Sequence, residues 1–341
     1  MQGNLPFFFF ASHVIVLDKR QTARSGDVTG GIDMAYQKFT GTYHSCDHIN
    51  RVHYYIYEPE TDLRAILQIV HDFGDSVERN EDLIRFFTDH GVMICGCDHI
   101  GHGRSARKED YGFFGNRNGW TYLVKDMKKL THYMKREYPD IPYFVYGHGL
   151  GSLIVRLGSF REKGINGIIL SGTSGRQRHC KRKILFASFL KRMEGAKKES
   201  RFLKSNLCRK LNRRFRSEQD HWSFLAADEG ARKEYSRALS DKITLTVAAY
   251  EDIFKILVLA STKKKYEDIN QEIPILLISG AEDSIGNFGK GVEEVRRRLE
   301  DTHHHTMMKL YEGMRHNITD EPGKEMVFYD MLEWMKGYIA E

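Results

Sequence analysis

Prolines are scarce in this chain, and its cysteines have no regular spacing. Six prolines in 341 residues, with 41% hydrophobic and 12% aromatic residues, exclude a largely disordered protein. Five cysteines, an odd number, exclude a disulfide framework and indicate reduced thiols in a cytosolic setting. The length permits one large core with an insertion, or two modest domains.

The N-terminal region lacks the features of a targeting or membrane-spanning segment. Residues 5–17 are mostly apolar, but Pro6 interrupts them, no basic residue precedes them, and Lys19 and Arg20 follow. In a signal peptide the basic residues precede the apolar run, whereas here they follow it. The run is also too short to span a bilayer. We therefore expect residues 1–36 to form a poorly ordered extension, with a membrane-touching tail as the alternative.

The sequence also lacks the spacing of a metal site and of a phosphate-binding loop. Cys95 and Cys97 alternate within an apolar run and have no partner pair, so we interpret them as strand packing. The adjacent histidines 303–305 cannot converge on one ion and fit a surface loop. The GHGRS segment, residues 101–105, has no Lys-Ser/Thr ending. We expect no metal and no cofactor.

From about residue 39, short apolar runs alternate with glycine-rich polar loops and with segments of helical period. The runs include RAILQIV, VMICGC, PYFVYG, NGIILSG, IPILLISG and TMMKLYEG. Repetition of strand, loop and helix predicts an α/β fold, with a mostly parallel sheet covered by helices on both faces. In such sheets, ligands bind beyond the carboxyl ends of the strands, where these glycine-rich loops lie.

The alternation of strand and helix patterns stops between residues 176 and 270, which contain no strand-like run. Apolar residues recur there at four-residue spacing, which is typical of one face of a helix: Leu203, Leu207, Leu211 and Phe215. We predict a helical cap, or lid, inserted into the α/β core. The chain would then comprise the extension 1–36, the core 37–175 and 271–341, and the cap 176–270.

Charge is concentrated at the start of this predicted cap. Residues 176–216 hold sixteen Lys or Arg and two Glu, so this stretch carries +14 and the rest of the +6 chain carries −8. The basic residues form either a solvated helix face or a surface that attracts anionic lipid headgroups or an anionic ligand. No nucleic-acid-binding motif accompanies them, so we expect no nucleic-acid partner.

The segment YGHGLGSL, residues 146–153, follows the run IPYFVY and leads into a helical start. A strand, a sharp glycine-rich turn and a helix are typical of the nucleophile elbow of hydrolases. At the nucleophile position stands Gly149, which has no group able to attack a carbonyl. Asp283 and His316 follow later strands, in the order nucleophile, acid, base. We predict that these two residues form an acid–base pair, either remnant or working.

Together these motifs resemble the monoacylglycerol lipase and lysophospholipase-like branch of the α/β-hydrolases over most of residues 43–338. The likeness is carried by HDFG from His71, DHIGHGRS at 98–105, Gly119 with Trp120, LSGTSG at 170–175 and DSIGNFGKGV at 283–292. The resemblance implies a carboxylic ester hydrolase scaffold and a lipid-like ester or acyl ligand. It also implies an oxyanion hole formed by the backbone N–H groups of Phe73 and Leu150, with His148 beside the nucleophile position.

Two departures from the family pattern concern catalysis. Where the family has Gly-His-Ser-Met-Gly, residues 147–151 read GHGLG, and glycine tolerates the strained turn without destabilising the fold. Asp72 stands where the family's oxyanion turn has glycine, and its carboxylate would oppose the developing negative charge. Ser152 lies about one helical turn beyond the elbow, so we do not assign it as a substitute nucleophile.

Three interpretations of the activity follow. The favoured one is a pseudoenzyme that has lost serine-ester hydrolysis and keeps a cap-covered acyl pocket. The second is an active lipase or lysophospholipase whose nucleophile was removed by engineering or sequence error, although Asp72 would then be a second, unexplained change. The third is direct attack by water, with His316 as base. We expect a cytosolic protein that can also bind the membrane surface through its basic cap.

Overall fold

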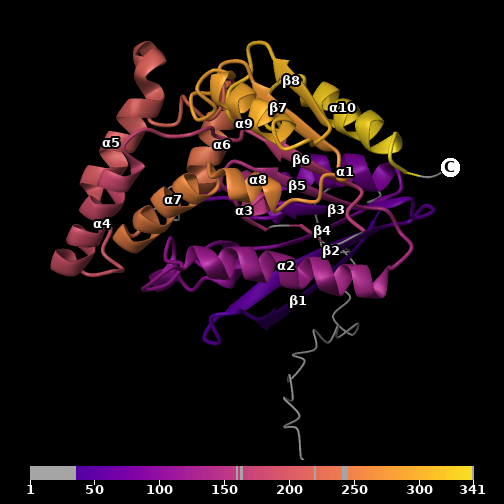
Figure 1. Cartoon of the computed structure of the whole chain (residues 1–341), viewed down its shortest axis with the longest axis horizontal. Coiled ribbons are helices and arrows are strands. Elements are labelled where there is room, and N and C mark those ends of the chain that lie inside the picture. The colour runs from indigo at the N-terminus through magenta and orange to yellow at the C-terminus, as the bar shows by residue number, and fades with distance from the viewer. Residues whose placement is uncertain (1–35, 159, 162–163, 219, 240–244, 340–341) are drawn as a thin grey trace, which may run out of the picture.

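The computed structural model describes residues 36–339, except 159, 162–163, 219 and 240–244. Nearly all of the predicted N-terminal extension therefore lies outside the described residues. The described part is a twisted sheet with helices on both of its faces and a group of helices projecting at one side (Figure 1).

Eight strands form one sheet in the order β1-β2-β4-β3-β5-β6-β7-β8. The first two pairings, β1 with β2 and β2 with β4, are antiparallel, and all the others are parallel. The strands are β1 (Tyr36–His44), β2 (Arg51–Pro59), β3 (Ala65–Val70), β4 (Val92–Cys97), β5 (Tyr143–His148), β6 (Gly167–Ser171), β7 (Ile275–Gly280) and β8 (Thr306–Tyr311).

The central strands are buried along their whole length because helices cover both faces of the sheet. Successive side chains of a strand point to opposite faces, so β5 contributes to two separate cores. Phe144 and Tyr146 pack with α1 (Glu81–Asp89) and α10 (Lys324–Lys336). Tyr143 and Val145 belong to the opposite core, where α2 and α3 pack. The predicted mostly parallel sheet covered on both faces is therefore confirmed.

The second face is covered by three helices of the core. These are α2 (Trp120–Glu137), α3 (Leu150–Leu157) and α9 (Lys290–Glu300). Between α3 and α9 the chain passes through β6, a long helical segment and β7. Because α3 begins directly after β5, the helix N-terminus lies at the carboxyl edge of the sheet.

Residues 172–274, which join β6 to β7, are named here the β6–β7 segment. They contain α4 (Cys180–Glu194), α5 (Arg201–Leu211), α6 (Glu229–Leu239), α7 (Val247–Leu259) and α8 (Lys263–Glu267). Among the described residues, its only β-pairing is an isolated bridge between Glu199 and Thr246. Helix α7 packs against α2, α3 and α4, whereas α4 and α5 project away from the sheet (Figure 1).

Local capping explains where two of these helices begin. The Ser200 side chain accepts a hydrogen bond from the Leu203 N–H at the start of α5. The Thr246 side chain accepts a hydrogen bond from the Ala249 N–H at the start of α7. Each cap satisfies an N–H group that has no partner within its own helix. None of the helices in the described residues combines the length and the apolar character needed to cross a bilayer.

Candidate active site

The carboxyl ends of four strands bring together residues that are far apart in the sequence. Asp72 follows β3, Gly149 follows β5, Asp283 follows β7 and His316 follows β8. All four strands run parallel in one sheet, with β6 between β5 and β7, so their carboxyl ends lie along the same edge. The predicted site residues therefore converge at the edge where ligands bind in α/β proteins.

Gly149 forms the sharp turn between β5 and α3. Its φ of 51° and ψ of −115° lie outside the regions that a residue with a Cβ adopts comfortably. The Gly149 N–H donates to the Ser171 carbonyl at 3.0 Å, and its own carbonyl accepts from the Ser152 N–H at 3.1 Å. The sequence places glycine where this turn requires a positive φ.

The carboxylate of Asp72 occupies the space beside Gly149. A Cβ built on Gly149 would lie 2.1 Å from Asp72 Oδ1 and 2.2 Å from its Cγ, well inside van der Waals contact. Asp72 Oδ1 accepts the backbone N–H of Leu150 at 2.5 Å. That Asp72 would oppose an anion at this turn stays a prediction. In the structure its carboxylate accepts the N–H of Leu150, which is one of the two predicted oxyanion donors.

His316 lies between two carboxylates and is completely buried. Its Nδ1 is 3.0 Å from Asp283 Oδ2, and its Nε2 is 3.1 Å from Asp72 Oδ2. Asp283 accepts further hydrogen bonds from the Ser279 hydroxyl and the Ile285 N–H. Both imidazole nitrogens are therefore engaged by carboxylate oxygens, which can only accept when ionised.

Burial alone would lower the pKa of His316, because it disfavours the imidazolium. Asp283 and then Asp72 outweigh burial and raise the pKa of His316 to about 10. Burial in turn would raise the pKa of Asp72, but hydrogen bonding and charge from His316 and the Leu150 N–H hold it below its usual range. At neutral pH the site thus holds His316 as an imidazolium, hydrogen-bonded to Asp283 and Asp72 and without a free lone pair.

His148 packs against His316, with ring centroids 4.7 Å apart. Its Nε2 donates to Asn317 Oδ1 at 3.2 Å, which leaves Nδ1 to accept from the Ser171 hydroxyl at 3.1 Å. Burial and the charge of His316 lower the pKa of His148. His148 therefore stays neutral beside the charged His316.

His71 and Phe73 flank Asp72 and have different surroundings. His71 Nδ1 donates to the Asp72 carbonyl at 2.7 Å, and its Nε2 accepts the His99 N–H at 3.0 Å. Burial, followed by repulsion from His102, lowers the pKa of His71 to about 3, so its imidazole stays neutral and fixes the turn. Phe73 instead lines a cavity above the site.

A metal ion is another ligand that such a cluster could hold. Asp72, His148 and His316 each offer one ligand atom, and these atoms lie within 4.8 Å of one another. Every one of these ligand groups already has a hydrogen-bond partner within the protein. Since metal binding needs a deprotonated His316, an ion would have to break the hydrogen bond to Asp72.

Ser152 does not lie in position to replace a nucleophile. Its side chain is fully buried, and its hydroxyl donates to the Gly149 carbonyl at 2.6 Å. The loop from Asp98 to Ser105 is also engaged internally, because Asp98 accepts N–H groups from Val77 and Arg104. Both features stabilise the turns around the site.

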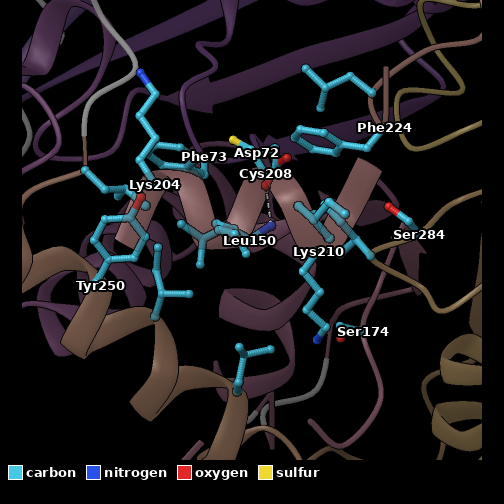
Figure 2. A pocket seen from close by; sticks show the side chains of 18 of the residues that line it. Asp72, Phe73, Leu150, Ser174, Lys204, Cys208, Lys210, Phe224, Tyr250 and Ser284 are labelled. Atoms are coloured by element: carbon cyan, nitrogen blue, oxygen red, sulfur yellow. Dashed lines mark hydrogen bonds between the residues drawn. The ribbon is translucent and has the colours of Figure 1, made fainter. Parts of the chain in front are cut away.

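A cavity of about 190 Å³ opens from Asp72, Gly149 and Leu150 toward the β6–β7 segment (Figure 2). Its walls are mostly apolar and aromatic, including Leu207, Leu211, Trp222, Phe224, Tyr250 and Phe254. Of the apolar stripe read from the sequence, Leu207 and Leu211 line the cavity, whereas Leu203 and Phe215 are buried in core clusters. The aromatic residues were missed in the sequence. Trp222 and Phe224 lie in an irregular turn, whereas Tyr250 and Phe254 are four residues apart on α7, a helical spacing that could have identified them.

The fold and the convergence of these residues define an α/β-hydrolase. A family model described as serine aminopeptidase, S33 (Hydrolase_4), matches residues 61–323, and the chain belongs to this family. It is 22% identical over 291 residues to a monoacylglycerol lipase of Mycolicibacterium smegmatis, covering 85% of this chain and 94% of the relative. These matches support the monoacylglycerol lipase branch.

Solved structures agree with this assignment. A thermostable carboxyl esterase from Bacillus coagulans, in complex with glycerol, superposes with a TM-score of 0.83 at 26% identity, covering 90% of this chain and all of the other. A soluble variant of monoglyceride lipase from Saccharomyces cerevisiae has a TM-score of 0.67 at 17% identity, covering 92% and 97% of the two chains. The second likeness concerns the fold alone.

Proposed function

We propose that this protein is a monoacylglycerol-lipase-like α/β-hydrolase that binds a long-chain acyl ligand and does not hydrolyse esters through a serine. Gly149 stands at the nucleophile position of the elbow, so no side chain there can attack a carbonyl. The observation that carries the proposal is the Asp72 carboxylate, which contacts both the Leu150 N–H and His316 Nε2.

Serine-ester hydrolysis needs a nucleophile, a base with a free lone pair and free donors for the oxyanion. Asp72 interferes with two of these together. It engages the Leu150 N–H, and it helps to raise the pKa of His316 to about 10. The same observation argues against direct water attack, because a protonated His316 cannot accept a proton from water at neutral pH.

The alternative of an active lipase or lysophospholipase with one removed nucleophile fits the packing less well. A serine at position 149 would place its Cβ 2.1 Å from Asp72 Oδ1 unless Asp72 moved. A parent enzyme with a serine there would therefore need a different residue, or a different conformation, at position 72. The two positions are coupled, which favours a site that lost its nucleophile and gained its carboxylate together.

We further propose that the β6–β7 segment acts as the cap over an acyl-binding cavity. Its residues supply most of the cavity wall, and the cavity floor is formed by Asp72, Gly149 and Leu150. The names of the relatives, lipases and esterases, suggest a lipid ester or its acyl product as ligand. Cavity walls that are mostly apolar would bind an alkyl chain by removing it from water.

The outer face of the same segment favours a membrane surface as partner. Large apolar side chains on α4 and α5 are exposed to solvent, namely Leu185, Phe186, Phe189, Met193 and Phe202. They lie among the sixteen basic residues of 176–216. Apolar residues that insert into the interface and cations that attract anionic headgroups act together in peripheral membrane binding. We propose that these helices hold the protein, at least transiently, at an anionic membrane.

One experiment tests the central proposal by separating binding from turnover. The protein is incubated with monopalmitoylglycerol and with lysophosphatidylcholine, and both thermal stability and released fatty acid are measured. A stabilised fold without product supports the proposal, because a ligand that binds only the folded state must raise the melting temperature. Hydrolysis abolished by His316→Ala would establish catalysis and refute it. Absence of any stabilisation at millimolar ligand would refute acyl binding.

A further inference from the structure

The cavity wall contains cations that an acyl chain alone does not require. Lys183 from α4, and Lys204 and Lys210 from α5, line the same cavity as its apolar residues. In Figure 2, Lys210 extends toward Ser174 at one end of the drawn cavity, while Lys204 extends away from it. Lysine is uncommon in the wall of an apolar pocket unless it meets a polar or charged group.

Two of these lysines are positioned by neighbours within the cavity. The Lys183 ammonium lies 5.3 Å from the centre of the Phe254 ring. Lys210 Nζ donates to Gln177 Oε1 at 3.1 Å, and Gln177 Nε2 donates in turn to the Ser174 hydroxyl at 2.9 Å. Within the described part of the chain, neither Lys183 nor Lys210 forms an ion pair with a carboxylate.

The two ammonium groups also repel each other. Partial desolvation, and then the charge of Lys183, lower the pKa of Lys210. Lys183 is half-buried and Lys210 is exposed. Two cations close together without a carboxylate create a positive potential there. An anion placed between them would relieve this repulsion and accept charge-assisted hydrogen bonds.

We propose that the cavity binds a single-chain amphiphile with an anionic head group, its alkyl chain in the apolar part and its head between Lys183 and Lys210. This inference rests on the proposed acyl-binding function and names its ligand class. Two kinds of ligand fit this description, a fatty carboxylate and a lysophosphate monoester. Both carry an oxyanion on a single acyl chain. The phosphate carries up to two negative charges near neutral pH and would engage both ammonium groups more fully.

Calorimetric titration below the critical micelle concentration tests the proposal with four probes. These are palmitate, palmitoyl lysophosphatidate, monopalmitoylglycerol and palmitoyl lysophosphatidylcholine. We expect at least one anionic probe to bind about 10-fold or more tightly than the neutral one, with an affinity that falls as salt is raised. Of the two anionic probes, the one that binds with higher affinity identifies the preferred head group. Competition by monopalmitoylglycerol should show that they share one cavity.

The variant Lys183→Met/Lys210→Met removes both charges and retains long apolar side chains. It should bind the anionic probes about 10- to 100-fold more weakly and monopalmitoylglycerol within about 3-fold. The matched control, Lys181→Met/Arg209→Met, removes the same charge from exposed positions of α4 and α5 outside this cavity. It should leave all four affinities nearly unchanged. If the double variant fails to fold, Lys210→Gln alone should show the same selective loss.

The outcomes separate this inference from the function on which it rests. Equal binding of anionic and neutral probes, unaffected by the Lys183→Met/Lys210→Met change, would overturn the anionic-ligand proposal alone. An equal loss in the exposed control would assign the effect to the general basic surface and would also overturn it. Failure of every probe to bind would instead refute the acyl-binding function itself.

Discussion

Asp72 and His316 are 244 residues apart in the sequence, yet Asp72 Oδ2 lies 3.1 Å from His316 Nε2. The other oxygen of the same carboxylate accepts the Leu150 N–H. One side chain therefore contacts both the predicted base and one of the predicted oxyanion donors. In the proposed function, Asp72 and Gly149 form a coupled pair. Changing only one of them to the residue of the family pattern should therefore not restore ester hydrolysis.

The first prediction concerns this coupling. Gly149→Ser alone should lower the free energy of unfolding, by about 1 to 3 kcal/mol from backbone strain at a positive φ and by more from overlap with Asp72. Gly149→Ser/Asp72→Gly should recover part of that stability because the overlap is gone. Urea denaturation of the two variants measures the difference.

The same pair of variants should differ in chemistry. The double variant should react with an active-site phosphonate probe and hydrolyse short esters, because His316 can then act as base. The single variant should be about 100-fold slower or worse, since its Leu150 N–H stays engaged by Asp72. His316→Ala in the double variant is the control and should abolish labelling. A fast Gly149→Ser single variant would contradict the assigned role of Asp72.

The second prediction concerns the protonation of His316. With a pKa of about 10, its ring should remain an imidazolium at pH 7, while His71, whose pKa is about 3, should be neutral. In Asp72→Asn the amide N–H can donate to His316 Nε2, so the pKa of His316 should fall. Titration of the imidazole Cε1–H signals by NMR measures both rings. A neutral His316 at pH 7 in the unaltered protein would contradict the proposal.

A third prediction follows from the same pKa through linkage. Because folding raises the pKa of His316 above the ordinary value near 6.5, its stabilisation is complete below pH 6.5 and is lost as the pH rises through about 10. Denaturation midpoints should therefore fall between pH 7 and pH 10. The fall should be shallower in Asp72→Asn. Equal slopes in the two proteins would show that Asp72 contributes nothing to the shift.

The fourth prediction tests the cavity itself. Leu211→Trp should fill part of the space and weaken monopalmitoylglycerol binding about 10-fold or more, because Leu211 lines the cavity. Leu185→Trp is the matched control, since Leu185 is 71% exposed and does not line it. Binding is measured by titration calorimetry, with thermal melts to confirm folding. Equal affinities in both variants would place the ligand elsewhere.

The fifth prediction concerns membranes. Phe186→Ser/Phe189→Ser should reduce cosedimentation with vesicles containing 30% phosphatidylserine, because it removes apolar side chains that would insert. Met326→Ser/Tyr329→Ser changes two exposed residues on α10, far from the basic region in sequence, and should have no effect. Binding should weaken with salt and be minor on phosphatidylcholine alone. Salt-insensitive binding, or equal binding to both lipids, would contradict the proposed anionic partner.

Much of the fold could be predicted because its determinants are local. Buried parallel strands appear as short apolar runs such as RAILQIV, and the loops after them are marked by glycine. The edge strand Tyr36–His44 was missed, since it is exposed or half-buried along most of its length and shows no apolar run. Part of the aromatic cavity wall gives no local signal for a similar reason, because Trp222 and Phe224 lie in an irregular turn.

The sequence by itself determined the α/β class, the order of Gly149, Asp283 and His316 along the chain, and the absence of a hydroxyl at the turn. It also marked Asp72 as an unusual residue. Only the tertiary structure decided what that residue does, because the meeting of β3, β5 and β8 at one sheet edge brings its carboxylate against both Leu150 and His316. Strand patterns are local in the sequence, whereas protonation and steric fit depend on distances between segments that only folding brings together.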